Sequence, residues 1–293
     1  MILFLSSSSK SLGIGNIKRC EYLRNELVKK RIKCFSYYER KLNIKKIINL
    51  IEKKKIKNII IDDYKYKEKH RKIFKELGCK IIQISYFNDN DKYIDLFINY
   101  LKKKTKKTRV INDISYAILK PYTKFNFKKK DTIMIYLSNV NLKDLKRIVL
   151  SISLNFKDIK IIVISNYKFN QIIKIKKYHS NVTFFRKKNN LNQYLNRCKI
   201  LISGGGLISL EGLRYKVQNI VIYSNLFQNV NSQYLIKKKF ISFRTKLENL
   251  DLKKLIQKIN FLLKKPKKLK SIEKNSVKKT ALILVKEMYL KNL

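Results

Sequence analysis

Residues 199–214 read Lys199-Ile-Leu-Ile-Ser-Gly-Gly-Gly-Leu-Ile-Ser-Leu-Glu-Gly-Leu-Arg214. The short apolar run 200–202 predicts a buried strand, and the apolar residues from Leu207 onward recur at helical spacing. Three consecutive glycines join the strand to the helix. A strand, a glycine loop and a helix in succession present backbone N–H groups and a helix N-terminus to an anion. The stretch therefore predicts a phosphate-binding turn in an α/β fold.

Outward from this stretch, short apolar runs alternate with amphipathic segments along the chain. We expect strands at 1–6, 32–36, 58–61, 80–84, 132–137, 159–164, 182–185, 200–202 and 219–223. We expect helices at 16–30, 42–54, 66–77, 142–154, 169–177, 191–197, 207–214, 233–239, 252–263 and 280–290. Two weaker apolar segments within 93–119 receive no assignment. Continuous apolar strands that alternate with amphipathic helices predict parallel sheets covered on both faces.

The apolar periodicity breaks at 120–130, which holds Pro121 and a lysine run, and then restarts. A chain of 293 residues is long enough for two such halves. We therefore expect two doubly wound domains, 1–125 and 126–270. Ligands of such sheets bind outside the carboxyl ends of the strands. Glycines follow both the first strand and the strand at 200–202, which predicts one cleft if the two halves face each other.

The composition is strongly basic, with 69 Lys and Arg against 20 Asp and Glu and a net charge of +49. Of the basic residues 58 are Lys, and Ile, Asn, Tyr and Phe are also abundant, as an A/T-rich genome favours. Two interpretations stay open: lysines on solvated surface positions, or a surface for nucleic acid or anionic membrane. Arg is rare and Lys is spread over every helix, which speaks against specific nucleic-acid recognition.

The sequence contains no run of about 18 apolar residues, so no membrane span is expected. The first residues, 1–5, are too short for a signal-peptide core and predict a strand. The four cysteines have no paired spacing, which argues against a zinc site and a disulfide framework. These features predict a protein of the reducing cytoplasm.

Five motifs in order resemble those of one family. They are Ser8–Arg19 with its Gly13-x-Gly15, Ile60–Tyr64, Ser115–Leu119, Ser203–Glu211, and Gln228 with the later 237–240. Together they resemble the UDP-sugar hydrolases of pseudaminic acid biosynthesis. The motif at 203–211 is also similar to that of the peptidoglycan UDP-N-acetylglucosamine transferases.

The resemblance implies the two-domain glycosyltransferase-B architecture. It implies that the C-terminal domain holds the nucleotide and that the final helix, 271–293, returns to the N-terminal domain. It further implies hydrolysis of a UDP-linked 2,4-diacetamido-2,4,6-trideoxy sugar to UDP and the free sugar, in surface-polysaccharide biosynthesis. No cofactor and no metal are expected.

The binding candidates lie in two parts of the sequence, 13–19 and 204–228. The resemblance and the loop chemistry assign UDP or substrate contacts to Gly13, Gly15, Arg19, Gly204, Gly205, Gly206, Leu207, Glu211 and Gln228. The three-glycine loop would hold the phosphates, unless it is only a tight turn. Glu211 would bind the ribose hydroxyls, unless it is a solvated helix residue.

The catalytic candidates are Asn16, Asp63 and Tyr64. Asn16 stands where the family has its catalytic His, and an amide cannot accept a proton from water near pH 7. It would contact the substrate or cap the following helix. Asp63, at the end of a predicted strand, would replace the missing base, unless Asp62 and Asp63 form only a turn. Tyr64 matches a substrate-contact tyrosine of the family.

The first hypothesis is thus a UDP-sugar hydrolase that acts on a UDP-linked amino sugar. A glycosyltransferase of the same fold and a UDP-sugar binder without turnover are the alternatives. A basic nucleic-acid-binding protein is the fourth; its binding would be abolished by modest salt if it rested on charge alone.

Overall fold

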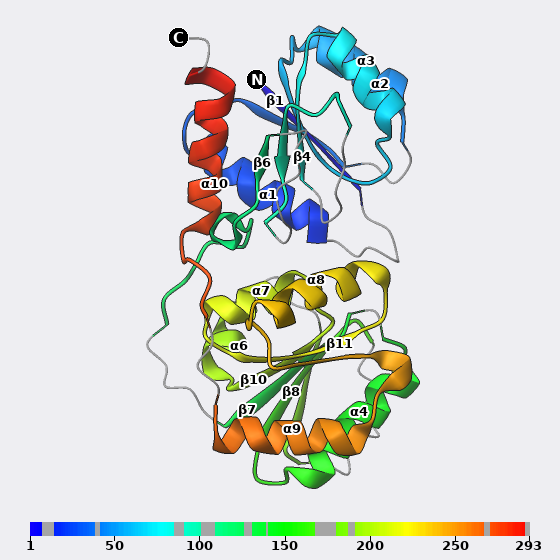
Figure 1. The fold of residues 1–293 in the computed structure, drawn as a ribbon, viewed down its shortest axis with the longest axis vertical. Coiled ribbons are helices and arrows are strands. Elements are labelled where there is room, and N and C mark those ends of the chain that lie inside the picture. Colours follow the sequence, from blue (N-terminus) through cyan, green and yellow to red (C-terminus); the bar gives the residue numbers. More distant parts are fainter. Residues whose placement is uncertain are drawn as a thin grey trace. The chain divides into compact units, whose positions relative to one another are not determined.

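The computed structural model describes residues 1–7, 15–38, 42–84, 91–100, 109–125, 131–138, 140–167, 180–186, 191–266 and 270–290. The chain splits into two compact units. Unit 1 consists of Met1–Pro121 and Glu273–Leu293, and unit 2 of Tyr122–Ile272. Each unit contains a six-stranded sheet whose paired strands are all parallel, with helices on both faces (Figure 1). The predicted α/β class with two Rossmann-like units is confirmed.

The sheet of unit 1 has the order β2-β1-β3-β4-β5-β6. Its strands are β1 (Ile2–Ser6), β2 (Cys34–Tyr37), β3 (Asn58–Asp62), β4 (Lys80–Ile84), β5 (Leu96–Ile98) and β6 (Val110–Ile111). The chain leaves β1 toward β2 and then crosses back to β3 on the other side of β1. The carboxyl ends of β1 and β3 therefore form the topological switch point, where ligands bind in such sheets.

Helices cover both faces of this sheet. They are α1 (Gly15–Val28), α2 (Ile44–Lys53), α3 (Glu68–Glu76) and α10 (Ser276–Val285), the last followed by a π-helical turn, Lys286–Leu290. The α2 and α3 helices bury Ile47, Ile51 and Phe74 against Leu3 and Leu5 of β1. On the other face α1 packs against β1, and α10 packs against α1 (Figure 1). The C-terminal helix thus belongs to unit 1.

The sheet of unit 2 has the order β12-β11-β10-β7-β8-β9. Its strands are β7 (Thr132–Tyr136), β8 (Lys160–Ser165), β9 (Val182–Arg186), β10 (Ile200–Ser203), β11 (Gln218–Tyr223) and β12 (Phe243–Lys246). The chain runs from β7 outward to β9 and returns to β10 on the opposite side of β7. The switch point of unit 2 therefore lies at the carboxyl ends of β7 and β10.

Among the described residues, helices cover both faces of this second sheet, and one further helix packs against β11 and β12. They are α4 (Leu142–Asn155) and α9 (Leu252–Lys264), then α6 (Asn192–Arg197) and α7 (Leu207–Arg214), and finally α8 (Leu226–Lys237). Alternate residues of β7 face opposite layers: Ile133 and Ile135 pack with α4 and α9, and Met134 packs with α6 and α7. This alternation is the period of two that a buried strand requires.

The helix predicted at 233–239 is wrong in its start, because α8 begins at Leu226. Asn225 accepts a hydrogen bond from the Gln228 N–H and caps the helix, so residues 226–232 are helical as well. The strand β12 was not predicted, nor were β5 and β6 within the unassigned segment. The helix predicted at 169–177 and the candidate Gly13 lie outside the described residues.

A search of the described residues for a helix both long and apolar enough to cross a membrane finds none.

Candidate functional site

The three-glycine loop of unit 2 connects the end of β10 to the start of α7. Gly205 has φ +82°, a left-handed conformation that favours glycine. Gly206 precedes the first residue of α7, Leu207, and has no side chain to cap the helix. A Cβ on Gly206 would meet nothing within 4 Å. The first N–H groups of α7 therefore lack a side-chain cap, which leaves them suited to bind an anion.

Gln228, in the first turn of α8, lies against this loop. Its Oε1 accepts hydrogen bonds from the backbone N–H of Ser224 at 2.8 Å and from the Ser224 hydroxyl at 3.2 Å. A Cβ on Gly204 would lie 2.7 Å from Gln228 Nε2 and 3.0 Å from its Cδ. Glycine at 204 is thus what allows the amide to contact the loop, and the structure brings these two predicted residues together.

Glu211 lies on α7, on the side of the unit 2 switch point. It is 7% exposed, so the alternative of a solvated helix residue is wrong. Burial raises the pKa of Tyr136, the last residue of β7, to about 12, and the charge of Glu211 adds to that rise. Burial lowers the pKa of Arg214, an effect that Glu211 opposes. The buried carboxylate therefore acts electrostatically on the side chains of Tyr136 and Arg214.

Sequence reasoning missed two polar residues near the same loop. Asn231 is buried and donates to the Gly205 carbonyl at 3.4 Å, while its Oδ1 has no hydrogen-bond partner. The guanidinium of Arg244 lies 4.8 Å from the centre of the Tyr223 ring and also bonds to Ser232 at 3.2 Å. Asn231 lies in the part of α8 that was not predicted, and Arg244 lies on β12, which was not predicted either.

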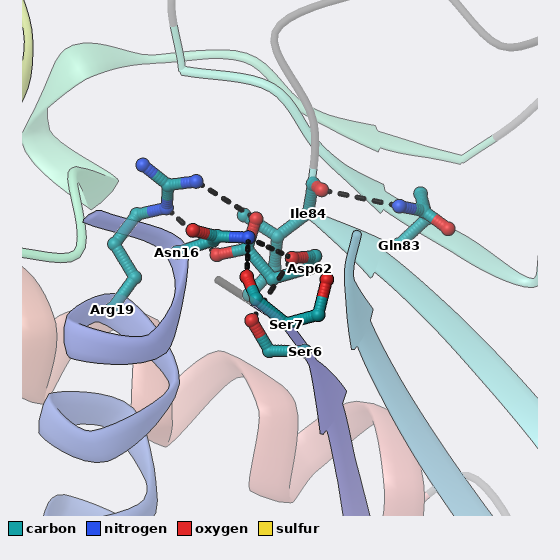
Figure 2. Close-up of polar contacts among 7 residues, drawn as sticks. All are labelled: Ser6, Ser7, Asn16, Arg19, Asp62, Gln83 and Ile84. Atoms are coloured by element: carbon teal, nitrogen blue, oxygen red, sulfur yellow. Dashed lines mark hydrogen bonds and ion pairs between the residues drawn. The ribbon is translucent and has the colours of Figure 1, made fainter. Parts of the chain in front are cut away.

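In unit 1, Arg19 and Asp62 form a buried ion pair at the switch point (Figure 2). Arg19 lies on α1, and its Nε and Nη2 donate to the two carboxylate oxygens of Asp62, each at 2.8 Å. The Ser6 hydroxyl donates to the Asp62 carbonyl at 3.2 Å. Burial raises the pKa of the Asp62 carboxyl, and Arg19 opposes that rise. The guanidinium predicted to contact the substrate is thus bound to Asp62.

Asn16 connects the carboxyl ends of β1 and β3 in unit 1. Its Nδ2 donates to the carbonyl of Ser7, after β1, at 2.7 Å and to the carbonyl of Asp62, on β3, at 3.1 Å (Figure 2). The residue is 8% exposed. It lies one position inside α1, and its amide donates to strand carbonyls, so the alternative of a helix cap is wrong. Its side chain holds the switch point together.

Asp63 differs from its neighbour Asp62 in having an oxygen with no hydrogen-bond partner. Its Oδ1 accepts from the Lys65 N–H at 3.0 Å, whereas its Oδ2 is buried and unbonded. The residue is 4% exposed, and the following Tyr64 is 47% exposed with Lys67 Nζ 5.9 Å from its ring centre. Of the two acidic residues, Asp63 alone has a carboxylate oxygen without a hydrogen-bond partner among the described residues.

Among the described residues, a Cβ on Gly15, the first residue of α1, would meet only Arg19 Nη1 at 3.9 Å, so none of them requires glycine there. Within the described part of the chain, no group of three His, Cys, Asp or Glu side chains is arranged to hold a metal ion.

No protein-family model matches the chain, and no curated protein matches it in sequence. Solved structures do match it in fold. S. aureus MnaA, in a co-structure with UDP, has a TM-score of 0.69 at 11% identity and covers 100% of this chain and 97% of its own. UDP-GlcNAc 2-epimerase from Neisseria meningitidis, bound to UDP-GlcNAc, has a TM-score of 0.63 at 12% identity, with 100% of both chains covered.

MurG from Acinetobacter baumannii has a TM-score of 0.65 at 10% identity and covers 96% of this chain and 93% of its own. Identities this low show the fold alone. The chain therefore has the glycosyltransferase-B type of fold, as the resemblance implied, while membership of the pseudaminic-acid hydrolase family stays a prediction.

Proposed function

We propose that the chain is a UDP-sugar enzyme in which unit 2 binds UDP. The contact of Gln228 with Gly204 carries this proposal, because it places an amide beside a loop whose helix N–H groups have no side-chain cap. Backbone N–H groups at a helix N-terminus favour a diphosphate. Glu211 is the candidate for the ribose hydroxyls. Two of the solved structures of this fold contain UDP or UDP-GlcNAc, which supports the choice of nucleotide.

We infer further that the reaction is hydrolysis of the bond between the sugar and UDP. Water attacks the anomeric carbon, its proton passes to Asp63 Oδ2, and UDP leaves. Asp63 is the base of choice because Oδ2 is unbonded, whereas Arg19 occupies both oxygens of Asp62. Backbone N–H groups and lysine charge stabilise the negative charge that develops on UDP. Tyr64, which is exposed, would contact the face of the sugar.

The sequence resemblance suggests a 2,4-diacetamido-2,4,6-trideoxy sugar as the substrate and surface-polysaccharide biosynthesis as the setting. No cofactor enters the proposed reaction. Cys20, Cys34, Cys79 and Cys198 are not joined in disulfides, which suits a reducing compartment, and we place the enzyme in the cytoplasm.

One observation favours a second candidate, a UDP-sugar binder without turnover. Asn16 occupies the position of the family's catalytic His, and its amide is engaged by two backbone carbonyls. If Asp63 does not replace the missing base, binding would persist without chemistry. A transferase is the third possibility, because an acceptor hydroxyl would then replace water as the nucleophile.

The test is a UDP-release assay on the purified full chain, combined with calorimetric titration of UDP. Release from the UDP-linked 2,4-diacetamido sugar without an acceptor supports the hydrolase. Release only with an added acceptor supports a transferase, and UDP binding with no release under either condition supports the binder. The absence of UDP binding would overturn the proposal as a whole.

A further inference from the structure

Asn99 is the most poorly satisfied side chain among the described residues. It is 1% exposed, and neither its Nδ2 nor its Oδ1 has a hydrogen-bond partner. Its backbone N–H donates to the Ile111 carbonyl at 2.9 Å, so the residue is held in place by β6. A buried amide with both polar atoms unbonded destabilises a fold, and such groups are rare unless they serve a purpose.

The register of the sheet places Asn99 in line with two other unbonded groups. Ser6 pairs with Asp62, and Ile84 pairs with Ile98; the pairing of Ile61 with Gln83 aligns these two pairs in one row. One residue further along β1, β3 and β5 lie Ser7, Asp63 and Asn99, while the corresponding position after β4 lies outside the described residues. In-register neighbours of parallel strands direct their side chains to the same face.

All three members of this second row carry a buried, unbonded polar atom: Ser7 Oγ, Asp63 Oδ2 and both amide atoms of Asn99. The row follows the carboxyl ends of β1, β3 and β5, the edge at which such sheets bind ligands. The strands β3 and β5 are separated by two strand spacings, about 10 Å. Asp63 and Asn99 would therefore contact different parts of one sugar.

Two other buried asparagines show what a merely structural amide looks like in this fold. Asn219 donates through Nδ2 to the Ser209 carbonyl at 3.0 Å and has only its Oδ1 unbonded. Asn58 likewise has only Oδ1 unbonded, and it lies at the opposite end of β3. Asn99 differs from both because its donor and its acceptor are unbonded together, at the ligand-binding edge.

We propose that the side-chain amide of Asn99 binds the N-acyl group next to the anomeric carbon of the sugar, an inference that rests on the proposed function. An N-acyl group offers one N–H donor and one carbonyl acceptor, which an asparagine amide matches with one acceptor and one donor. A hydroxyl at that carbon matches the amide pair less completely. Asn99 is thus the residue that selects N-acylated over plain hexoses.

The test compares UDP, UDP-glucose and UDP-N-acetylglucosamine as ligands of the full chain, by calorimetric titration. The two sugar nucleotides differ only at the carbon beside the anomeric carbon. We expect the natural chain to prefer UDP-N-acetylglucosamine about tenfold, which corresponds to about 1.4 kcal/mol. Asn99→Leu, of similar volume and apolar, should abolish this preference and leave the Kd for UDP unchanged.

Asn58→Leu is the matched control, and it should keep the preference. Asn99→Ser, which retains a polar group in less volume, repeats the test should the leucine variant fail to fold. The inference is overturned if the natural chain shows no preference, if Asn99→Leu retains it, or if that variant weakens UDP and UDP-N-acetylglucosamine equally. If the natural chain binds no UDP, the proposed function fails and this inference fails with it.

Discussion

Arg19 donates two hydrogen bonds of 2.8 Å to the carboxylate of Asp62, 43 positions further along the chain. Both side chains are almost fully buried, at 6% and 5% exposure. The pair joins α1 to β3 beside the proposed catalytic Asp63, so the position of Asp63 depends on it.

Replacing Arg19 by Leu should lower the free energy of unfolding by about 3–5 kcal/mol, because it leaves Asp62 buried without its partner. Urea denaturation of the purified variant measures the loss. Lys18→Ala is the control on the same helix, since the Lys18–Glu21 pair is partly exposed and should contribute less than about 1 kcal/mol. Equal losses in the two variants would show that the buried pair has no special role.

The Arg19→Leu loss should also depend on pH. Burial already raises the pKa of Asp62 above its ordinary 3.8, and removing Arg19 raises it further. A carboxyl with a raised folded pKa contributes stability that is fully present below its unfolded pKa and is lost as the pH rises through the folded pKa. The difference between Arg19→Leu and the natural chain should therefore be smaller at pH 4 than at pH 7. A loss that is the same at both would contradict this.

Gly204→Ala should weaken UDP binding. Its Cβ would lie 2.7 Å from Gln228 Nε2, and Gln228 cannot move away without losing its bond to the Ser224 N–H. We expect a displaced amide and a loss of about 1–3 kcal/mol of stability from overpacking. Calorimetric titration of UDP and thermal unfolding report the two effects.

Gly206→Ala is the matched control two residues away, because its Cβ would meet nothing within 4 Å. It should leave stability nearly unchanged. The double variant Gly204→Ala with Gln228→Ala should recover the stability that Gly204→Ala loses, since the contact is then absent. If the double variant does not regain this stability, Gln228 is not the residue that requires a glycine at position 204.

Asp63→Asn should reduce UDP release by about 100-fold to 10,000-fold, the usual contribution of a general base. The Kd for UDP should not change, because the proposed nucleotide contacts lie in unit 2. Asp113→Asn is a control aspartate of unit 1 whose carboxylate accepts a bond from the Ser115 N–H. It should keep full activity, and unchanged release by Asp63→Asn would exclude Asp63 as the base.

The strands that sequence predicted well are those with a long apolar run. The β3 strand reads Asn58–Asp62 with three consecutive isoleucines, and its prediction at 58–61 differs by one residue. The strands β5 and β6 contain three and two residues, which is too short for a periodicity to appear. The start of α8 was missed because the buried positions of its first turns, Gln228, Asn231 and Ser232, are polar, although Asn225 provided a capping signal.

The candidate site was predictable to the extent that it is local. Gly204 to Glu211 form one continuous stretch whose loop and helix follow from residue types alone. The pairing of Arg19 with Asp62 depends instead on the sheet, which brings Asp62 of β3 beside Ser6 at the end of β1. The unbonded amide of Asn99 has the same origin, since it depends on register across four strands. Contacts of this kind require the three-dimensional fold.

Thr280→Val should detach the C-terminal helix in part from unit 1. The fully buried Thr280 hydroxyl lies 2.7 Å from the Tyr116 carbonyl and 3.1 Å from the Ser276 carbonyl, and Lys279 Nζ lies 4.6 Å from the Tyr116 ring centre. Valine has the same shape and removes only the donor, so we expect a loss of about 1–2 kcal/mol in urea denaturation. Thr280→Ser should recover most of that loss because it keeps the hydroxyl.

Leu282→Ala, at a position that is 49% exposed on the same helix, should change stability by less than about 0.5 kcal/mol. If Thr280→Val behaves like Leu282→Ala, the hydroxyl does not hold the helix, and its attachment rests on its other contacts with unit 1.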